Sequence, residues 1–253
     1  MENLSPRQQS ILNRVVDTHI ETAEPVGSQA ITSLYQSLFQ DSYSPATVRH
    51  EMGLLEDMGY LMHPHTSAGR VPTDRGYRYY VDHGLREEEI PKTDFDSLTN
   101  SLYGMREEGE RFAENLSTAL SEWTEELCLV IVPRKRRHQV FLQGTSRILD
   151  KPEFQTLEKA RMILRALDEK IKMTEWLLES APEEGISVTI GRENGAEAFH
   201  DCTVISARCL VAPDAAVAFA VIGPRRMRYA RTVPLVEKVA RLARRMLQTD
   251  PSE

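Results

Sequence analysis

Hydrophobic residues recur at helical spacing in two segments at the start of the chain. The first segment follows Ser5-Pro6, in which Ser5 can cap a helix and Pro6 fits its first turn, and Gln8 can complete a capping box. Glu24-Pro25-Val26-Gly27 breaks this helix, and Ser28 can cap a second, shorter one through residue 37. The apolar positions predicted to face inward are Ile11, Leu12, Val15, Val16 and Ile20 in the first helix, and Ala30, Ile31 and Leu34 in the second.

A third helix is predicted where the cap-and-proline pair recurs as Ser44-Pro45. It covers roughly Ala46 to Met58, and Gly59 ends it. The apolar positions expected on its inner face are Val48, Met52, Leu55 and Met58.

A hairpin and one more helix are predicted directly behind the third helix. A strand begins at Tyr60-Leu61-Met62, residues 63–72 form the hairpin, and Ser67-Ala68-Gly69 are at its tip. Thr73 caps a last helix over residues 74–85. Three helices followed by a hairpin are the layout of a winged helix-turn-helix that binds DNA.

The polar side of the third helix supplies the first candidate DNA contacts. Small or hydrogen-bonding side chains near the N-terminus of a recognition helix suit a major groove. Arg49 is the natural candidate for reading a guanine edge. An amphipathic helix with a solvated polar face explains the same pattern, so both interpretations stay open. The candidates are Ser44, Ala46, Thr47, Arg49 and His50.

The hairpin and the helix behind it supply the second group of candidates. Small residues at a hairpin tip let the backbone approach a phosphate, and an arginine beside them can reach a phosphate or the minor groove. The alternative is an ordinary structural hairpin. The candidates are His65, Thr66, Ser67, Gly69, Arg70, Arg75 and Arg78.

The remaining chain alternates helical and strand-like segments, which predicts an α+β sheet domain. Amphipathic helices are expected over residues 95–125 and 154–180, and a final helix contains residues 233–246. The apolar positions that mark the buried face of the second of these helices are Leu157, Ala160, Leu164, Leu167, Ile171 and Leu178. The expected strands are 127–132, 140–142, 186–190, 203–211 and 217–222. The predicted division is a DNA-binding domain at 1–86, a linker and long helix at 87–125, and an α+β domain at 126–253.

Charge and composition narrow the class of protein. The formal net charge is −7, and the first 86 residues hold seven Arg, no Lys and ten Asp or Glu. This balance excludes a protein that coats nucleic acid by bulk electrostatics, whereas a local arginine face fits specific docking. We expect neither a membrane span nor a signal peptide in this sequence. The three cysteines lie in apolar, strand-like segments, which suggests reduced residues in the core. We therefore expect a cytoplasmic protein. We expect neither catalysis nor a cofactor, and His63-Pro64-His65 lacks a third metal ligand nearby.

Several ordered motifs resemble the heat-inducible transcription repressor family HrcA. They include Glu24–Ser28, Ser44–Arg49, Pro64–Tyr80, Ile190–Asn194 and Val221–Tyr229. The resemblance implies a GAF-like body behind the DNA-binding head. It also implies a homodimer on an inverted-repeat operator of the CIRCE type upstream of chaperone genes, and modulation by the chaperonin GroEL.

The chain departs from the family pattern between Val132 and Val140. The resemblance implies further strands and an inserted dimerisation domain there, but only seven residues connect the two positions. The cationic run at 134–137 is either a second DNA contact or a solvated hairpin at the site of a deletion. Without the insert, dimerisation is expected through the helices at 95–125 and 154–180. The alternative function is a sensor or protein-interaction module with a vestigial DNA-binding head.

Overall fold

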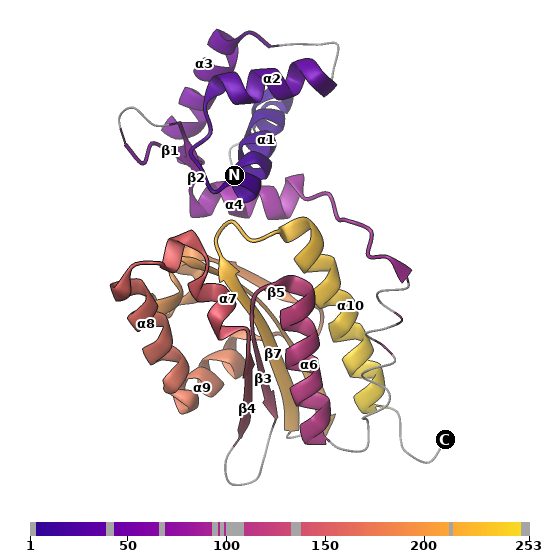
Figure 1. The fold of residues 1–253 in the computed structure, drawn as a ribbon. Coiled ribbons are helices and arrows are strands. Elements are labelled where there is room, and N and C mark those ends of the chain that lie inside the picture. The colour runs from indigo at the N-terminus through magenta and orange to yellow at the C-terminus, as the bar shows by residue number, and fades with distance from the viewer. Residues whose placement is uncertain are drawn as a thin grey trace. The chain divides into compact units, whose positions relative to one another are not determined.

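A computed structural model shows the fold (Figure 1) and describes residues 4–38, 43–65, 69–92, 109–132, 138–212 and 215–248, with the single residues 96 and 99. Contacts divide the chain into a first unit, Met1–Arg86, and a second unit, Glu87–Glu253. Each unit has its own buried core.

The first unit begins with the three helices α1 (Pro6–Thr22), α2 (Ser28–Leu38) and α3 (Pro45–Asp57). The capping box of α1 is confirmed, since Ser5 and Gln8 each donate a backbone N–H to the other's side chain. The predicted face of α1 is buried at Ile11, Leu12, Val15 and Val16. In α2, Ile31 is buried, but the prediction for Ala30 was wrong: it is exposed, and Thr32 is buried in its place.

The inner face of α3 is confirmed at Val48, Met52 and Leu55, whereas Met58 lies beyond the helix and is only half-buried. The sequence pattern missed the burial of Glu51, whose carboxylate accepts a hydrogen bond from Arg7 at 3.4 Å. A buried charge of this kind gives no hydrophobic signal, because only its partner makes the burial tolerable.

A two-stranded antiparallel hairpin follows, formed by β1 (Leu61–Met62) and β2 (Val71–Pro72). Gly59, at φ +78°, supplies the left-handed turn between α3 and β1. Beyond β2, Thr73 accepts a hydrogen bond from the N–H of Gly76 and caps α4 (Asp74–Tyr79), which continues as a π-helical turn, η1 (Tyr80–Gly84). The predicted strand, hairpin and capped helix are therefore present.

The last helix of the first unit packs on α1. Tyr77 and Tyr80 are buried. The hydroxyl of Tyr80 donates to Asp17 at 2.6 Å, and the hydroxyl of Tyr77 shares a 2.6 Å hydrogen bond with Nδ1 of His19. Each buried tyrosine hydroxyl thus has a hydrogen-bond partner on α1. The first and last helices of the unit are therefore held together by polar as well as apolar contacts.

The second unit contains a five-stranded antiparallel sheet in the order β4-β3-β7-β6-β5. Each predicted strand is found, with small shifts at the ends. The strands are β3 (Leu127–Val132), β4 (Gln139–Gln143), β5 (Ser187–Ile190), β6 (Cys202–Ala212) and β7 (Ala215–Pro224).

Helices cover both faces of this sheet (Figure 1). Leu127 and Leu129 of β3 join the core beneath α7 (Thr145–Leu149), α8 (Leu157–Asp168) and α9 (Lys170–Ser180). Cys128, between them, lies on the opposite face beside Thr124 of α6 (Gly109–Thr124). The final helix, α10 (Tyr229–Gln248), packs on β6 on that same opposite face, where Ala240 contacts Cys209. Successive side chains of each strand point to opposite faces of the sheet, so the strands contribute to two cores, one on each face.

The expectation of one long helix over residues 154–180 was wrong. The backbone breaks at Glu169, at φ −80° and ψ 61°, and separates α8 from α9. The predicted face is confirmed at Leu167, which is buried, and in part at Leu178, which packs partly buried against the core. Ile163, Met173 and Leu177 are also buried, although the pattern did not include them. Leu157, Leu164 and Ile171, which were expected inside, are exposed.

The three cysteines are free and buried, as the sequence indicated. Burial raises the pKa of the Cys209 thiol to about 11. None of the helices in the described part of the chain is long and apolar enough to cross a membrane. The predicted tip residues Thr66, Ser67 and Ala68, most of the segment 93–108, and the cationic run 134–137 lie outside the described residues.

Candidate nucleic-acid interface

The N-terminus of α3 is held by its own hydroxyl groups. Ser44 is the N-cap, and its Oγ accepts the N–H of Thr47 at 3.1 Å. The two hydroxyls share a second hydrogen bond of 2.9 Å. Ser44 and Thr47, both candidates for DNA contact, therefore already fix the start of the helix.

Ala46, Arg49 and His50 lie together on the exposed side of α3. Their positions fall within one stripe of the helix, opposite the buried Val48 and Met52. Neither Arg49 nor His50 makes an ion pair with any residue that the structure describes. This stripe presents a small side chain, a guanidinium and an imidazole in the first two turns of a capped helix.

Arg70 extends the same stripe from the hairpin. Its Nε donates to Oε2 of Glu56 at 3.0 Å, and its side chain is 14% exposed. A Cβ atom added at Gly53 would lie 3.9 Å from Nη2 of Arg70, so the guanidinium covers the turn of α3 after Arg49. The hairpin arginine and the helix arginine are thus neighbours on one surface.

Glu56 also accepts a 2.6 Å hydrogen bond from Nδ1 of His63, which precedes the hairpin tip. Partial burial by itself raises the pKa of Glu56, but the hydrogen bonds and charges of His63 and Arg70 outweigh it, so the pKa of this carboxyl is lowered. The carboxylate therefore stays ionised and holds both arms of the hairpin to the last turns of α3.

The backbone next to the predicted hairpin tip is fixed against the segment before α2. Arg70 and Val26 exchange two backbone hydrogen bonds of 2.9 Å. A Cβ atom at Gly69 would lie 2.5 Å from both the carbonyl carbon and the oxygen of Val26. The sequence pattern suggested that Gly69 lets a phosphate approach, and the structure shows that the fold itself requires this glycine.

Arg75 and Arg78 are also engaged within the unit. Arg75 donates to the carbonyl of Met58 at 2.7 Å and lies 4.5 Å from the ring centre of Tyr60. Arg78 pairs with Asp82 at 3.3 Å, one helical turn away. His65 is exposed. Among the candidate residues for DNA contact, the side chains of Arg49 and His50 are exposed. Arg70, Arg75 and Arg78 instead form hydrogen bonds or ion pairs within the first unit.

Comparison with known proteins places these observations in a family. Residues 83–233 match the family described as HrcA protein C terminal domain. The chain is 30% identical to the heat-inducible transcription repressor HrcA of Desulforudis audaxviator, with 97% of this chain and 98% of that protein covered. It is 26% identical to the repressor of the same name from Shouchella clausii, with coverages of 94% and 96%.

The alignment with the Desulforudis protein is 343 positions long, whereas this chain has 253 residues, so at least 90 aligned positions have no counterpart here. The chain is therefore a shortened relative. A crystal structure of a hypothetical protein at 2.2 Å resolution has the same overall fold, with a TM-score of 0.70, 20% identity, and 96% of this chain and 97% of that chain covered. Because the family match covers more than half of the sequence and the full-length relatives share its name, the chain belongs to the HrcA family of heat-inducible transcription repressors.

Proposed function

We propose that the first unit is a winged helix-turn-helix that binds one half of a DNA operator. The observation that carries this proposal is the exposed stripe of Ala46, Arg49 and His50 on a capped helix whose opposite side is buried. A recognition helix needs both properties, because its N-terminal residues reach the base edges while the rest of the unit holds it in place.

Within this stripe, Arg49 reads bases and His50 lies beside it. The guanidinium of an arginine is the common partner of guanine O6 and N7, and an exposed arginine without an ion pair in the described unit does not have to break one to bind. Ala46 leaves room for the groove wall. Thr47 and Ser44 keep the first turn of α3 in place.

The hairpin fixes the register of the helix on the DNA backbone. Glu56 holds Nε of Arg70, which leaves the Nη groups of Arg70 on the same surface as Arg49. An arginine oriented by a carboxylate is suited to a phosphate, because less side-chain entropy is lost on binding. His65 and the tip residues Thr66 and Ser67 would extend this contact, whereas Arg75 and Arg78 serve mainly the packing of the unit.

The second unit is proposed to be a reduced GAF-like domain that joins two chains. Its antiparallel sheet with helices on both faces supports this class. A symmetric pair of heads fits two half-sites related by a two-fold axis, so the proposed operator is an inverted repeat. The family relationship suggests an operator of the CIRCE type. The chaperonin GroEL is the proposed regulatory partner, on the family relationship alone.

Selection of operators from random DNA with the full chain tests the proposed function. The expected product is an inverted repeat, bound with a strong dependence on salt concentration. Arg49→Ala should lose the preferred base at one position of each half-site. Arg86→Ala is the matched control, because Arg86 is an exposed arginine at the end of the same unit. Recovery of no enriched sequence would refute the proposal and leave a protein-interaction module as the function.

A further inference from the structure

Three large apolar side chains lie exposed on α8 and α9. Leu157 is 65% exposed, Leu164 37% and Ile171 69%. Among the described residues, Met62 of the first unit is the other large hydrophobic side chain with comparable exposure. Apolar side chains gathered on one short stretch are typical of a surface that a partner covers.

Charged residues of both signs accompany the leucines on α8. Glu158, Arg161 and Arg165 are exposed, and none of them forms an ion pair with another described residue. Leu164 follows Leu157 by seven residues and Arg165 follows Glu158 by seven, so each pair lies on one side of the helix, two turns apart. The helix therefore carries an apolar stripe. Along one side of this stripe lies a row of charged residues, which is negative near the N-terminus of α8 and positive near its C-terminus.

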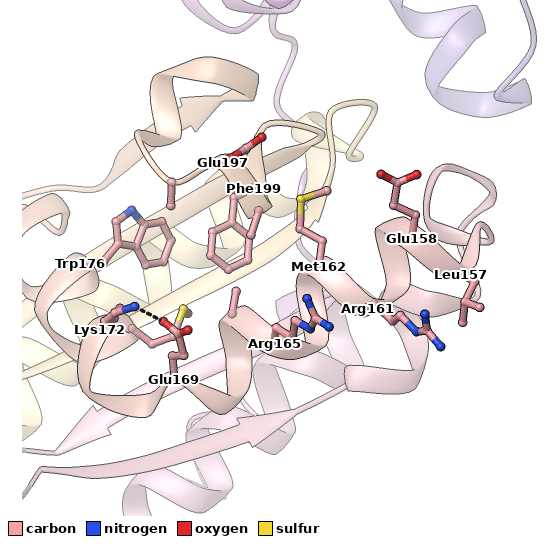
Figure 2. Close-up of a pocket in the computed structure, with 14 residues that line it drawn as sticks. Leu157, Glu158, Arg161, Met162, Arg165, Glu169, Lys172, Trp176, Glu197 and Phe199 are labelled. Carbon is pink, nitrogen blue, oxygen red and sulfur yellow. Dashed lines mark ion pairs between the residues drawn. The ribbon is translucent and has the colours of Figure 1, made fainter.

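An open groove continues this surface on the side of the charged flank. Its volume is about 990 Å³, and its lining includes Met162, Trp176 and Phe199. The rings of Trp176 and Phe199 stack at 5.0 Å, and Figure 2 shows them side by side next to Met162, with Leu157 and Glu158 farther along α8. Lys172 and Glu169 form a 2.6 Å ion pair at the rim. The apolar stripe and the groove therefore lie on either side of the charged flank of α8, and Leu157 borders both.

We propose that α8 is the surface through which two copies of this chain pair, with the two α8 helices antiparallel across a two-fold axis near Arg161. In this arrangement, Leu157 of each copy packs on Leu164 of the other, and Glu158 of each copy lies between Arg161 and Arg165 of the other. This inference rests on the proposed function in requiring a dimer, and it adds the surface that forms one.

Charge complementarity selects a second copy as the occupant. An isologous interface must complement itself, so that a positive group on one end of the helix meets a negative group on the other end. Glu158 and Arg165 satisfy this condition, because antiparallel pairing brings opposite ends together. Arg161 lies next to its own copy at the axis, and the Glu158 carboxylate of the other copy offsets its charge. A purely acidic or purely basic partner would leave one end of the helix facing like charge or unpaired.

The size of the surface predicts a weak dimer in the absence of DNA. Stable interfaces bury more than about 1,000 Å² in total, and one pair of three-turn helices with a shallow groove approaches this lower limit. Binding of both heads to one operator raises the effective concentration of the second contact. Dimerisation should therefore be concentration-dependent in solution and favoured on an inverted repeat.

Sedimentation equilibrium of the full chain, from low to high micromolar concentration without DNA, tests the proposal. The wild type should show a monomer–dimer equilibrium. Leu164→Glu should remain monomeric, and Glu158→Arg and Arg165→Glu should each weaken dimerisation by about tenfold or more, since each change acts twice in a symmetric pair. The double variant E158R/R165E should recover most of the loss. Met62→Glu, a charge placed on an equally exposed apolar residue of the first unit, should leave the equilibrium unchanged.

A wild type that stays monomeric at the highest concentration overturns the inference, as does dimerisation of Leu164→Glu at wild-type strength. Circular dichroism on each variant separates loss of pairing from loss of fold, and because the substituted residues are exposed, the fold should persist. Binding of a single half-site by the wild type, measured separately, tests the proposed function. Half-site binding together with unchanged dimers in all variants would refute the α8 surface and retain the DNA-binding function.

Discussion

Glu56 and Arg70, from the end of α3 and the end of the hairpin, form a 3.0 Å ion pair that joins the two elements expected on DNA. The same carboxylate accepts Nδ1 of His63. Glu56 therefore ties the hairpin to the helix that carries Arg49, in addition to the backbone hydrogen bonds between Arg70 and Val26. This pair therefore links the stability of the first unit to the proposed geometry of DNA binding.

Replacement of Arg70 by Ala separates a structural role from a phosphate contact. The partly buried pair should contribute on the order of 1 kcal/mol to the free energy of unfolding of the first unit. If Arg70 also binds a phosphate, its loss should weaken all DNA sequences similarly and reduce the slope of log affinity against log salt by about one. Urea denaturation and salt titrations of DNA binding measure the two effects. Glu56→Gln should reproduce the loss of stability, and an unchanged salt slope in Arg70→Ala would contradict the phosphate contact.

Arg49→Ala is expected to relax base specificity without destabilising the unit. Arg49 is exposed, so its removal leaves the core of α3 intact. Loss of a bidentate contact to guanine should cost about 1–3 kcal/mol on the preferred sequence and little on a sequence changed at that base pair. Competition gel shifts against single-base-pair variants of the operator measure this difference. Equal losses on every sequence would show that Arg49 contacts the backbone instead.

Gly69→Ala should destabilise the hairpin. The added methyl group would lie 2.5 Å from backbone atoms of Val26, so the double hydrogen bond between Val26 and Arg70 must open or shift. We expect a loss of about 2 kcal/mol or more, with weaker DNA binding in parallel. Gly27→Ala is the control, since no atom lies within 4 Å of a Cβ atom at that neighbouring glycine. Thermal denaturation of both variants tests the prediction, and equal melting temperatures would contradict it.

Glu126 should make the stability of the second unit depend on pH. It is 4% exposed, with one oxygen 3.1 Å from Nζ of Lys151 and the other without a hydrogen-bond partner in the structure. Burial raises the pKa of Glu126 from 4.5 to about 7, against the opposing effect of Lys151. Between these two values, the folded chain keeps a proton that the unfolded chain releases, so the free energy of unfolding falls as the pH rises.

The variant Glu126→Gln does not titrate and should lose this part of the pH dependence, which amounts to on the order of 3 kcal/mol at most. Urea denaturation at pH 5 and about pH 8 measures the change between those conditions. Glu183→Gln, at a 60% exposed side chain, is the control and should retain the wild-type slope. A variant E126Q with the wild-type slope would show that other groups cause it.

Asn194→Ala should destabilise the short helical turn η3 (Gly191–Asn194) and its neighbour η4 (Glu197–Phe199), which lines the groove beside α8. The buried amide of Asn194 donates to the carbonyls of Gly191, Phe199 and Cys202 at 2.8–2.9 Å, and its oxygen accepts the hydroxyl of Thr189 at 2.6 Å. Truncation leaves several buried acceptors unsatisfied and should cost about 2–4 kcal/mol. Denaturation followed by tryptophan fluorescence reports the change near Trp176, and a loss below about 1 kcal/mol would contradict the structural role.

Local signals in the sequence determined where the helices of the first unit begin and end. Ser5-Pro6 and Ser44-Pro45 start helices, Gly59 ends one, and Thr73 caps the last, because each of these residues acts through its own backbone and nearest neighbours. The same holds for the strands of the second unit, since continuous apolar runs such as Leu127–Val132 have few alternatives to a buried strand.

Only the tertiary structure decided which polar side chains are exposed without a partner in the described chain, and which apolar side chains are buried in a core. In the sequence, Arg49 and Arg70 are equivalent candidates for DNA contact. In the structure, Arg70 forms an ion pair with Glu56, because the hairpin folds back on α3. Glu51 is buried because Arg7 of another helix reaches it. Leu157, Leu164 and Leu167 share a predicted stripe by spacing, yet only Leu167 of the three is buried, together with Ile163 from outside that stripe. Spacing along a chain fixes which residues share a face, whereas the choice of the face that is buried depends on partners distant in sequence.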